Sequence, residues 1–136
     1  MRLLQPLVIT TALAGTAGPT RKVHRPDQFL SMTIQAKFTW GSGGTTVDAY
    51  VQTSLDEGTT WIDVANFHFL LASATKVLTL SSLTPVASFA PTNGSIASDT
   101  VKDGVFGNKW RVLVKSTGTY AGNTTLEVDV NAVEMT

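Results

Sequence analysis

Few residues in this chain have the type and spacing needed for chemistry, and they lie far apart. Asp56 and Asp63 would form an acid and base pair of the kind used in glycoside hydrolysis if they faced each other. We favour structural roles, with Asp56 bracing a turn and Asp63 lying on the surface of a strand. His24 and His68 are 44 residues apart, without the spacing of a metal-binding motif. We therefore expect no metal and no cofactor.

Motifs for nucleophilic or phosphate chemistry are also missing from the sequence. The chain has no cysteine, which excludes thiolate catalysis and disulfide crosslinks. It contains no G-x-S-x-G, H-E-x-x-H or P-loop pattern, and the glycine-rich stretch at 41–44 precedes no expected helix. These observations predict a protein without enzymatic activity.

The stretch SLDEGTTW, residues 54–61, follows the pattern S-x-D-x-G-x-T-W. In this pattern a carboxylate accepts hydrogen bonds from turn amides, glycine adopts a positive φ, and tryptophan packs beneath the hairpin. The stretch resembles the Asp-box of sialidases and other propeller proteins, where the motif lies away from the active site. It occurs here once, in a chain too short for a propeller. We therefore expect a structural hairpin, formed by Ser54, Asp56, Gly58, Thr60 and Trp61, with Trp61 anchored in the core.

The elements that would position these residues are strands. Apolar and polar residues alternate in TLEVDVNAV (125–133) and MTIQAKF (32–38), which is typical of half-buried strands. No segment has a run of apolar residues at helical spacing. Strands are expected near 3–10, 32–39, 46–53, 61–70, 75–81, 109–117 and 123–133. The chain is thus predicted to be all-β, a single antiparallel β-sandwich of about seven strands with jelly-roll or Ig-like topology.

The expected connections are hairpins at glycine-rich turns. Strands near 32–39, 46–54 and 60–70 are predicted to form a meander, and the last two strands another hairpin. Residues 1–27 are predicted to be an extended N-terminal arm, and residues 28–136 the sandwich domain. The arm begins like a secretory signal, but Gln5, Pro6, Thr10 and Thr11 dilute its apolar run.

Residues 83–108 form one long loop in this prediction, and loops of this length are usually functional or disordered. Its bulky apolar residues argue against disorder. Ten basic and ten acidic residues cancel, and charged residues make up only 15% of the chain against about a quarter in ordinary soluble domains. Part of the surface is therefore expected to meet a partner.

The candidate contact residues lie in the arm and the long loop. Basic Arg21, Lys22 and Arg25 would meet an acidic surface, and Phe89 and Phe106 would fill pockets of the partner. Two plainer interpretations remain. The basic residues would be solvated, and the phenylalanines would close the end of their own sandwich.

Two long stretches carry a family resemblance, TVDAYVQTSLDEGTTWIDVANFHF (46–69) and GNKWRVLVKSTGTYAGNTTLEVDV (107–130). They resemble small β-sandwich proteins encoded among the virion structural genes of tailed bacteriophages and prophages. The resemblance implies a non-enzymatic, homo-oligomeric protein of the virion, assembled in the cytoplasm of the host bacterium. Among virion roles, we favour that of a capsid decoration or cement protein, which would have the major capsid protein or neighbouring virion subunits as partners.

Two alternatives stay open at this point. A neck or tail component would be built from the same features. A carbohydrate-binding module would need several aromatic side chains coplanar on one face, with Trp40, Tyr50, Trp61 and Trp110 as candidates. The stretch TRKVHR has no interleaved aromatic residues, which argues against nucleic-acid binding. The apolar run at the N-terminus is too short for a membrane span of about 20 residues.

Overall fold

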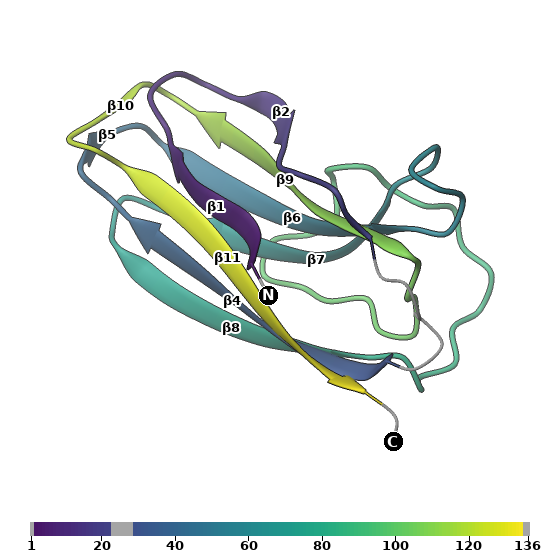
Figure 1. Ribbon diagram of the computed structural model, residues 1–136. Helices are drawn as coiled ribbons and strands as arrows, with labels where there is room; N and C mark the ends of the chain where they lie inside the picture. Colours follow the sequence, from purple (N-terminus) through teal and green to yellow (C-terminus); the bar gives the residue numbers. More distant parts are fainter. Residues whose placement is uncertain (1, 23–28, 135–136) are drawn as a thin grey trace.

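The computed structural model describes residues 2–22 and 29–134, and they form an antiparallel β-sandwich (Figure 1). The strands are β1 (Arg2–Val8), β2 (Ala14–Ala17), β3 (Arg21–Lys22), β4 (Phe29–Thr39), β5 (Ser42–Gly43), β6 (Thr46–Ser54), β7 (Ile62–Phe69), β8 (Ala74–Ser81), β9 (Lys109–Thr117), β10 (Tyr120–Ala121) and β11 (Thr125–Glu134). None of the described residues forms a helix that would be long and apolar enough to cross a bilayer. The predicted all-β sandwich is confirmed.

Two sheets make up the sandwich. The first, called sheet A below, has the order β1-β11-β4-β8, and the second, sheet B, has the order β2-β9-β6-β7 with β3 also paired to β9. Every pairing between these strands is antiparallel. The small β5–β10 ribbon joins the two sheets at one end of the molecule (Figure 1).

Strand alternation builds the core between the sheets. Along β4 the side chains of Met32, Ile34, Ala36 and Phe38 are buried, while the residues between them are exposed. β11 contributes Leu126, Val128 and Val130 in the same way, and sheet B supplies alternate residues of β6 and β9. Successive side chains of a strand point to opposite faces of its sheet. The apolar residues of each strand therefore lie on the face that packs in the core, and the polar residues lie on the other face.

The predicted hairpins are partly wrong. β6 and β7 do pair directly, but β4 lies in sheet A while β6 lies in sheet B. β9 and β11 are likewise in different sheets and do not pair with each other. The glycine-rich connections therefore cross from one sheet to the other as arches. Turn composition indicates that the chain reverses, but it does not say which sheet the next strand joins.

Glycine lets the two arches approach each other closely. Residues 41–44 and 118–122 pair through Tyr120 opposite Gly43 and Ala121 opposite Ser42. Gly44 has φ +76°, and a Cβ atom there would lie 2.0 Å from the ring of Tyr120. Only a residue without a side chain fits this contact.

The N-terminal segment is built into the sandwich, which corrects the expectation of an arm at residues 1–27. β1 is an edge strand of sheet A, and the chain then crosses to sheet B as β2 and β3. Leu3, Leu4 and Ile9 are buried in the core. Burying these apolar side chains in the core of the sandwich is more favourable than leaving them exposed to solvent. Residues 23–27 of the expected arm lie outside the described residues.

The arch contact yields a stability prediction. Gly44→Ala combines backbone strain with a clash against Tyr120, so we expect a loss of about 2–4 kcal/mol in the free energy of unfolding. Gly58→Ala is the matched control, because Gly58 has φ +94° but its nearest side-chain atom would be 3.6 Å from the new Cβ. The control should lose only about 1 kcal/mol. Urea unfolding would measure both variants. If both lost the same unfolding free energy, the contact between Gly44 and Tyr120 would not be a tight one.

Candidate functional site

The 54–61 hairpin is held by its own side chains. The Ser54 hydroxyl donates to Asp56 Oδ1 at 2.9 Å, and the backbone N–H of Thr60 donates to the same oxygen at 2.7 Å. The N–H of Gly58 in turn donates to the Ser54 hydroxyl. The Thr60 amide, followed by the hydroxyls of Thr60 and Ser54, lowers the pKa of Asp56 to about 2. Every interaction of this carboxylate is thus local and structural.

Trp61 does not anchor the hairpin in the core, which corrects the prediction from its sequence position. It is half-buried and lies outside the core cluster, and the guanidinium of Arg111 stacks over its ring at 4.2 Å. The buried tryptophan is Trp110, which is 1% exposed and donates from Nε1 to the carbonyl of Gly107. The hairpin turns outward before Trp61, so the indole covers the outer face of sheet B.

The low pKa of Asp56 makes its contribution to stability depend on pH. A carboxylate whose pKa is lowered by folding stabilises the protein above its unfolded pKa, and this contribution is lost as pH falls from about 4 to about 2. We expect Asp56→Ala to lower the melting temperature at pH 7 and to converge with the wild type near pH 2. Leu55→Ala, in the same turn, should show no such convergence. A gap between Asp56→Ala and wild type that stays constant with pH would contradict this role.

Asp63 is the second carboxylate, and it is buried rather than on the surface. It is 1% exposed at the start of β7, and its oxygens accept hydrogen bonds from the backbone N–H groups of Gly94, Ser95 and Ile96 at 2.8–3.2 Å. The Thr92 hydroxyl and Gln52 Nε2 also donate to it. A buried charge needs this many donors to offset its desolvation. Asp56 and Asp63 therefore serve separate sites and are not an acid and base pair.

This carboxylate fastens the long loop to sheet B. The backbone N–H groups of Asp63 and Asn66 donate to the carbonyls of Thr92 and Thr100, and Lys102 N donates to Val64 O. Residues 92–102 thus run beside the outer edge of β7 and occupy its hydrogen-bonding groups (Figure 1). An edge strand covered in this way is closed to other chains.

The loop also covers the outer face of sheet B with a polar network. Asn93 Oδ1 accepts from Gln52 Nε2 at 2.7 Å, and Gln52 Oε1 accepts from Arg111 Nε at 2.8 Å. Lys115 Nζ donates to the carbonyl of Gly94, whose backbone lies against Leu113. Asn93 and Gly94 are typical turn residues, but no local pattern links this turn to Asp63, which lies about 30 residues earlier in the chain.

Removing the Asp63 carboxylate should therefore loosen the loop as well as the fold. Asp63→Ala leaves three backbone amides without their acceptor, and we expect the free energy of unfolding to fall by about 3–5 kcal/mol. Asp99→Ala is the control, since Asp99 lies in the same loop but is exposed, and its pair with Lys76 is worth about 1 kcal/mol or less. Urea unfolding would measure both. Similar losses for the two variants would refute the anchoring role of Asp63.

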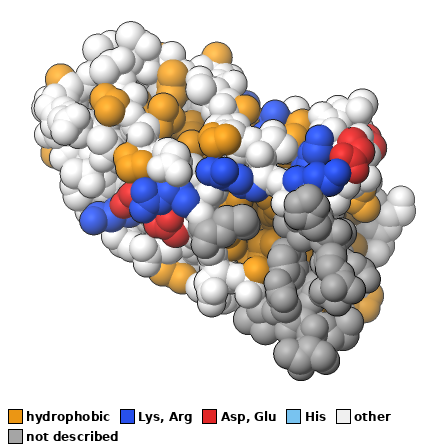
Figure 2. Space-filling model, viewed as in Figure 1, with side chains coloured by type: hydrophobic (Ala, Val, Ile, Leu, Met, Phe, Trp, Pro, Cys, Tyr) orange, Lys and Arg blue, Asp and Glu red, His pale blue; other side chains and the backbone are white. Residues whose placement is uncertain are grey.

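The predicted basic contact residues are mostly engaged within the molecule. Arg21 is half-buried in β3, and its Nε donates to the carbonyl of Arg2. Lys22 is exposed and lies 3.8 Å from Glu57. Arg25 lies outside the described residues. On the face seen in Figure 2, basic side chains lie singly or beside acidic ones and form no continuous basic patch.

The two phenylalanines have different surroundings. Phe106 packs edge-on against Trp110, with ring centroids 5.2 Å apart, and closes the end of its own sandwich. Phe89 is 36% exposed, and the ammonium group of Lys102 lies 3.7 Å from its ring centroid. Phe89 is thus the more exposed of the two.

The remaining polar groups form pairs rather than a reactive cluster. His68 Nδ1 lies 2.8 Å from Asp48 Oδ1, and its backbone N–H donates to Asp99. His24 lies outside the described residues. Within the described part of the chain, no three His, Cys, Asp or Glu side chains come together as a metal site would require.

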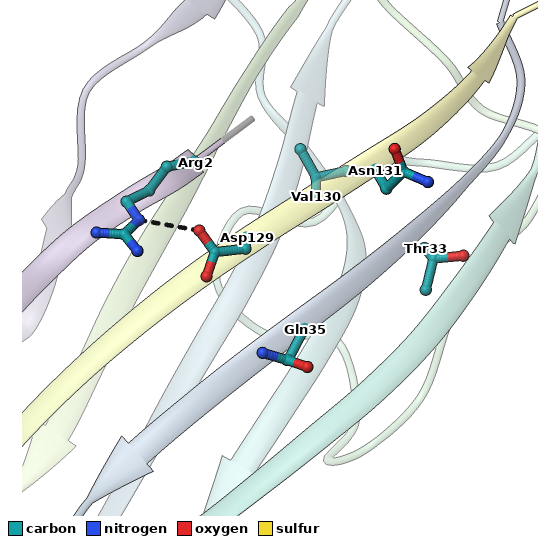
Figure 3. Close-up of a pocket in the computed structure, with 6 residues that line it drawn as sticks. All are labelled: Arg2, Thr33, Gln35, Asp129, Val130 and Asn131. Atoms are coloured by element: carbon teal, nitrogen blue, oxygen red, sulfur yellow. Dashed lines mark hydrogen bonds and ion pairs between the residues drawn. The ribbon is translucent and has the colours of Figure 1, made fainter.

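A shallow hollow of about 430 Å³ lies on the outer face of sheet A. Figure 3 shows Arg2 reaching Asp129 across neighbouring strands, with Thr33 and Gln35 along the adjacent β4. Arg2 Nε donates to Asp129 at 2.9 Å, and the pairing raises the pKa of Arg2. The hollow lies between side chains on the outer face of sheet A, and the charges of Arg2 and Asp129 in it already neutralise each other.

Exposed apolar side chains gather where the long loop leaves the sandwich. Leu83 is 72% exposed, and Val86 and Phe89 follow along the same stretch of the loop. Thr84 and Val86 lie against Gly104, and Lys102 lies over Phe89, so this stretch packs on the part of the loop that β7 holds in place. We treat this apolar loop surface as the candidate contact site.

No family model, curated protein or solved structure matches this chain.

Proposed function

We propose that this protein is a non-enzymatic structural protein of a tailed-bacteriophage virion, and that it decorates and stabilises the capsid shell. The observation that carries the proposal is the apolar loop surface, formed by Leu83, Val86 and Phe89. Exposed apolar side chains on a fixed segment are typical of protein contact sites. The resemblance of residues 46–69 and 107–130 to virion proteins supports the same assignment.

The way the loop is held suits a contact that must form many times on one shell. Asp63 binds three consecutive amides of the loop, so part of the entropy of ordering it is lost on folding and not on binding. Phe89 would supply a large anchor once the ammonium group of Lys102, which lies over its ring, moves aside. Many weak contacts of this kind add up through multivalency when copies cover a regular lattice.

The aromatic residues do not favour the carbohydrate-binding alternative. Trp110 and Tyr50 are buried, and Trp61 is covered by Arg111. Trp40 is half-buried at the arch end of β4, where its Nε1 donates to the carbonyl of Gly43. A sugar platform needs exposed rings side by side on one face, and the described residues do not provide one.

Binding to shells tests the proposal. The purified protein should co-sediment at a fixed stoichiometry with expanded empty capsids assembled from the major capsid protein of the same phage genome. The double variant Val86→Ser, Phe89→Ser should weaken this binding at least about tenfold, as expected for loss of an apolar anchor. Leu55→Ser, an exposed leucine in the 54–61 hairpin, is the matched control and should bind like the wild type.

Other outcomes separate the alternatives. A closed ring in solution that ignores the shells would assign the protein to the neck or tail. Unchanged binding of the double variant would show that the apolar loop surface is not the contact.

A further inference from the structure

The outer edge of β8 carries unpaired backbone groups. β8 bonds to β4 through its even-numbered residues, and Ser82 N continues this ladder to Leu30 O. The backbone of Ser81 points the other way, to Asp103 and Gly104. The intervening odd-numbered residues Thr75, Val77 and Thr79 share this outward direction, and no hydrogen bond from the described residues reaches their backbone groups.

The other edges of sheets A and B are protected in the described part of the chain. The loop covers β7, as described above. β1 contains Pro6 and two register shifts, and β2 and β3 are only four and two residues long. Short strands, bulges and proline are the usual means of keeping a sheet edge from pairing with other chains. β8 has none of these, although it spans eight residues in unbroken register with β4.

We propose that β8 pairs with β8 of a second copy of this chain, in antiparallel register about a two-fold axis at Val77. The outward row reads Thr75, Val77, Thr79, which is the same in both directions. Thr75 of each copy then faces Thr79 of the other, and the two Val77 side chains face each other. Threonine pairs and aliphatic β-branched pairs are favourable across antiparallel strands. Sheet A thereby becomes one continuous sheet of eight strands.

The side chains around this edge are apolar where the second copy would lie. Val77 is 58% exposed, and a groove of about 370 Å³ runs beside it, lined by Leu78 and Val101 among others. The contact would thus cover exposed apolar surface at the centre of the strand.

Charge is compatible with this self-pairing. The one charged residue of β8 is Lys76, whose Nζ lies 3.0 Å from both carboxylate oxygens of Asp99 and also donates to the carbonyl of His68. Each copy therefore brings a neutral pair to the interface, and its lysine stem faces Leu78 of the second copy. A free lysine pointing out of the edge would instead repel an identical strand.

This inference deepens the homo-oligomeric part of the proposed function, and its test uses the isolated protein without capsids. A protein that dimerises but does not bind shells would contradict only the proposed function. A protein that binds shells but stays monomeric would contradict only the present inference. Light scattering coupled to size-exclusion chromatography should show dimers whose fraction rises between about 5 and about 500 µM protein.

Charge variants at the symmetry axis make the test specific. Val77→Lys and Val77→Glu should each be monomeric and folded, because like charges would face each other across the axis. An equimolar mixture of the two should dimerise again. Gln35→Lys is the matched control, since Gln35 lies opposite Val77 on the same outer face but on the interior strand β4, and it should dimerise like the wild type.

Amide exchange identifies the pairing directly. The N–H groups of Thr75, Val77 and Thr79 should exchange at least about tenfold more slowly at high protein concentration than at low. A wild type that stays monomeric throughout the range, a dimer that persists in Val77→Lys, or a mixture that fails to pair would each overturn the proposal. Exchange at these amides that does not change with concentration would overturn it as well.

Discussion

The buried carboxylate of Asp63 is the interaction on which the outer half of the molecule depends. It lies at the start of β7, binds three consecutive amides of the loop, and accepts from Gln52 and Thr92 as well. Burying one charge is costly, and this site meets the cost with five donors from two distant parts of the chain. The loop is thereby joined to sheet B and behaves as a third layer.

Fastening the loop has two consequences for the surface. The outer edge of β7 and the outer face of sheet B are covered, because Gln52 and Lys115 bind the loop and Arg111 in turn binds Gln52. The apolar residues that the loop cannot bury are then held in place as an exposed surface. Sheet A has no such cover, and β8 is left as its one long regular edge among the described strands. The proposed contacts with a shell and with a second copy both follow from this asymmetry.

Among the described residues, the groups that look reactive in the sequence have structural partners. Asp56 braces its own turn, Asp63 holds the loop, and His68 pairs with Asp48. The positive charges of Arg2 and Lys22 lie beside acidic side chains of the same chain. The chain has little charge, and much of it is paired internally. The two proposed contacts therefore rely on apolar side chains and on backbone pairing.

Much of the fold was predictable because it depends on local pattern. Alternation along β4, β6 and β11 determined which residues face the core, and the absence of helical spacing determined the all-β class. The 54–61 turn was equally local, since Ser54, Asp56, Gly58 and Thr60 contact one another within seven residues.

Contacts between distant segments were decided only by the tertiary structure. The sequence could not show that β4 and β6 lie in different sheets, that residues 2–8 complete sheet A, or that Trp61 lies outside the core while Trp110 lies within it. It also could not reveal that Asp63 is buried, because the amides it binds are about 30 residues away. Periodicity reports which side of a strand is apolar, whereas partners across the sandwich depend on how loops close in space, which no local pattern records.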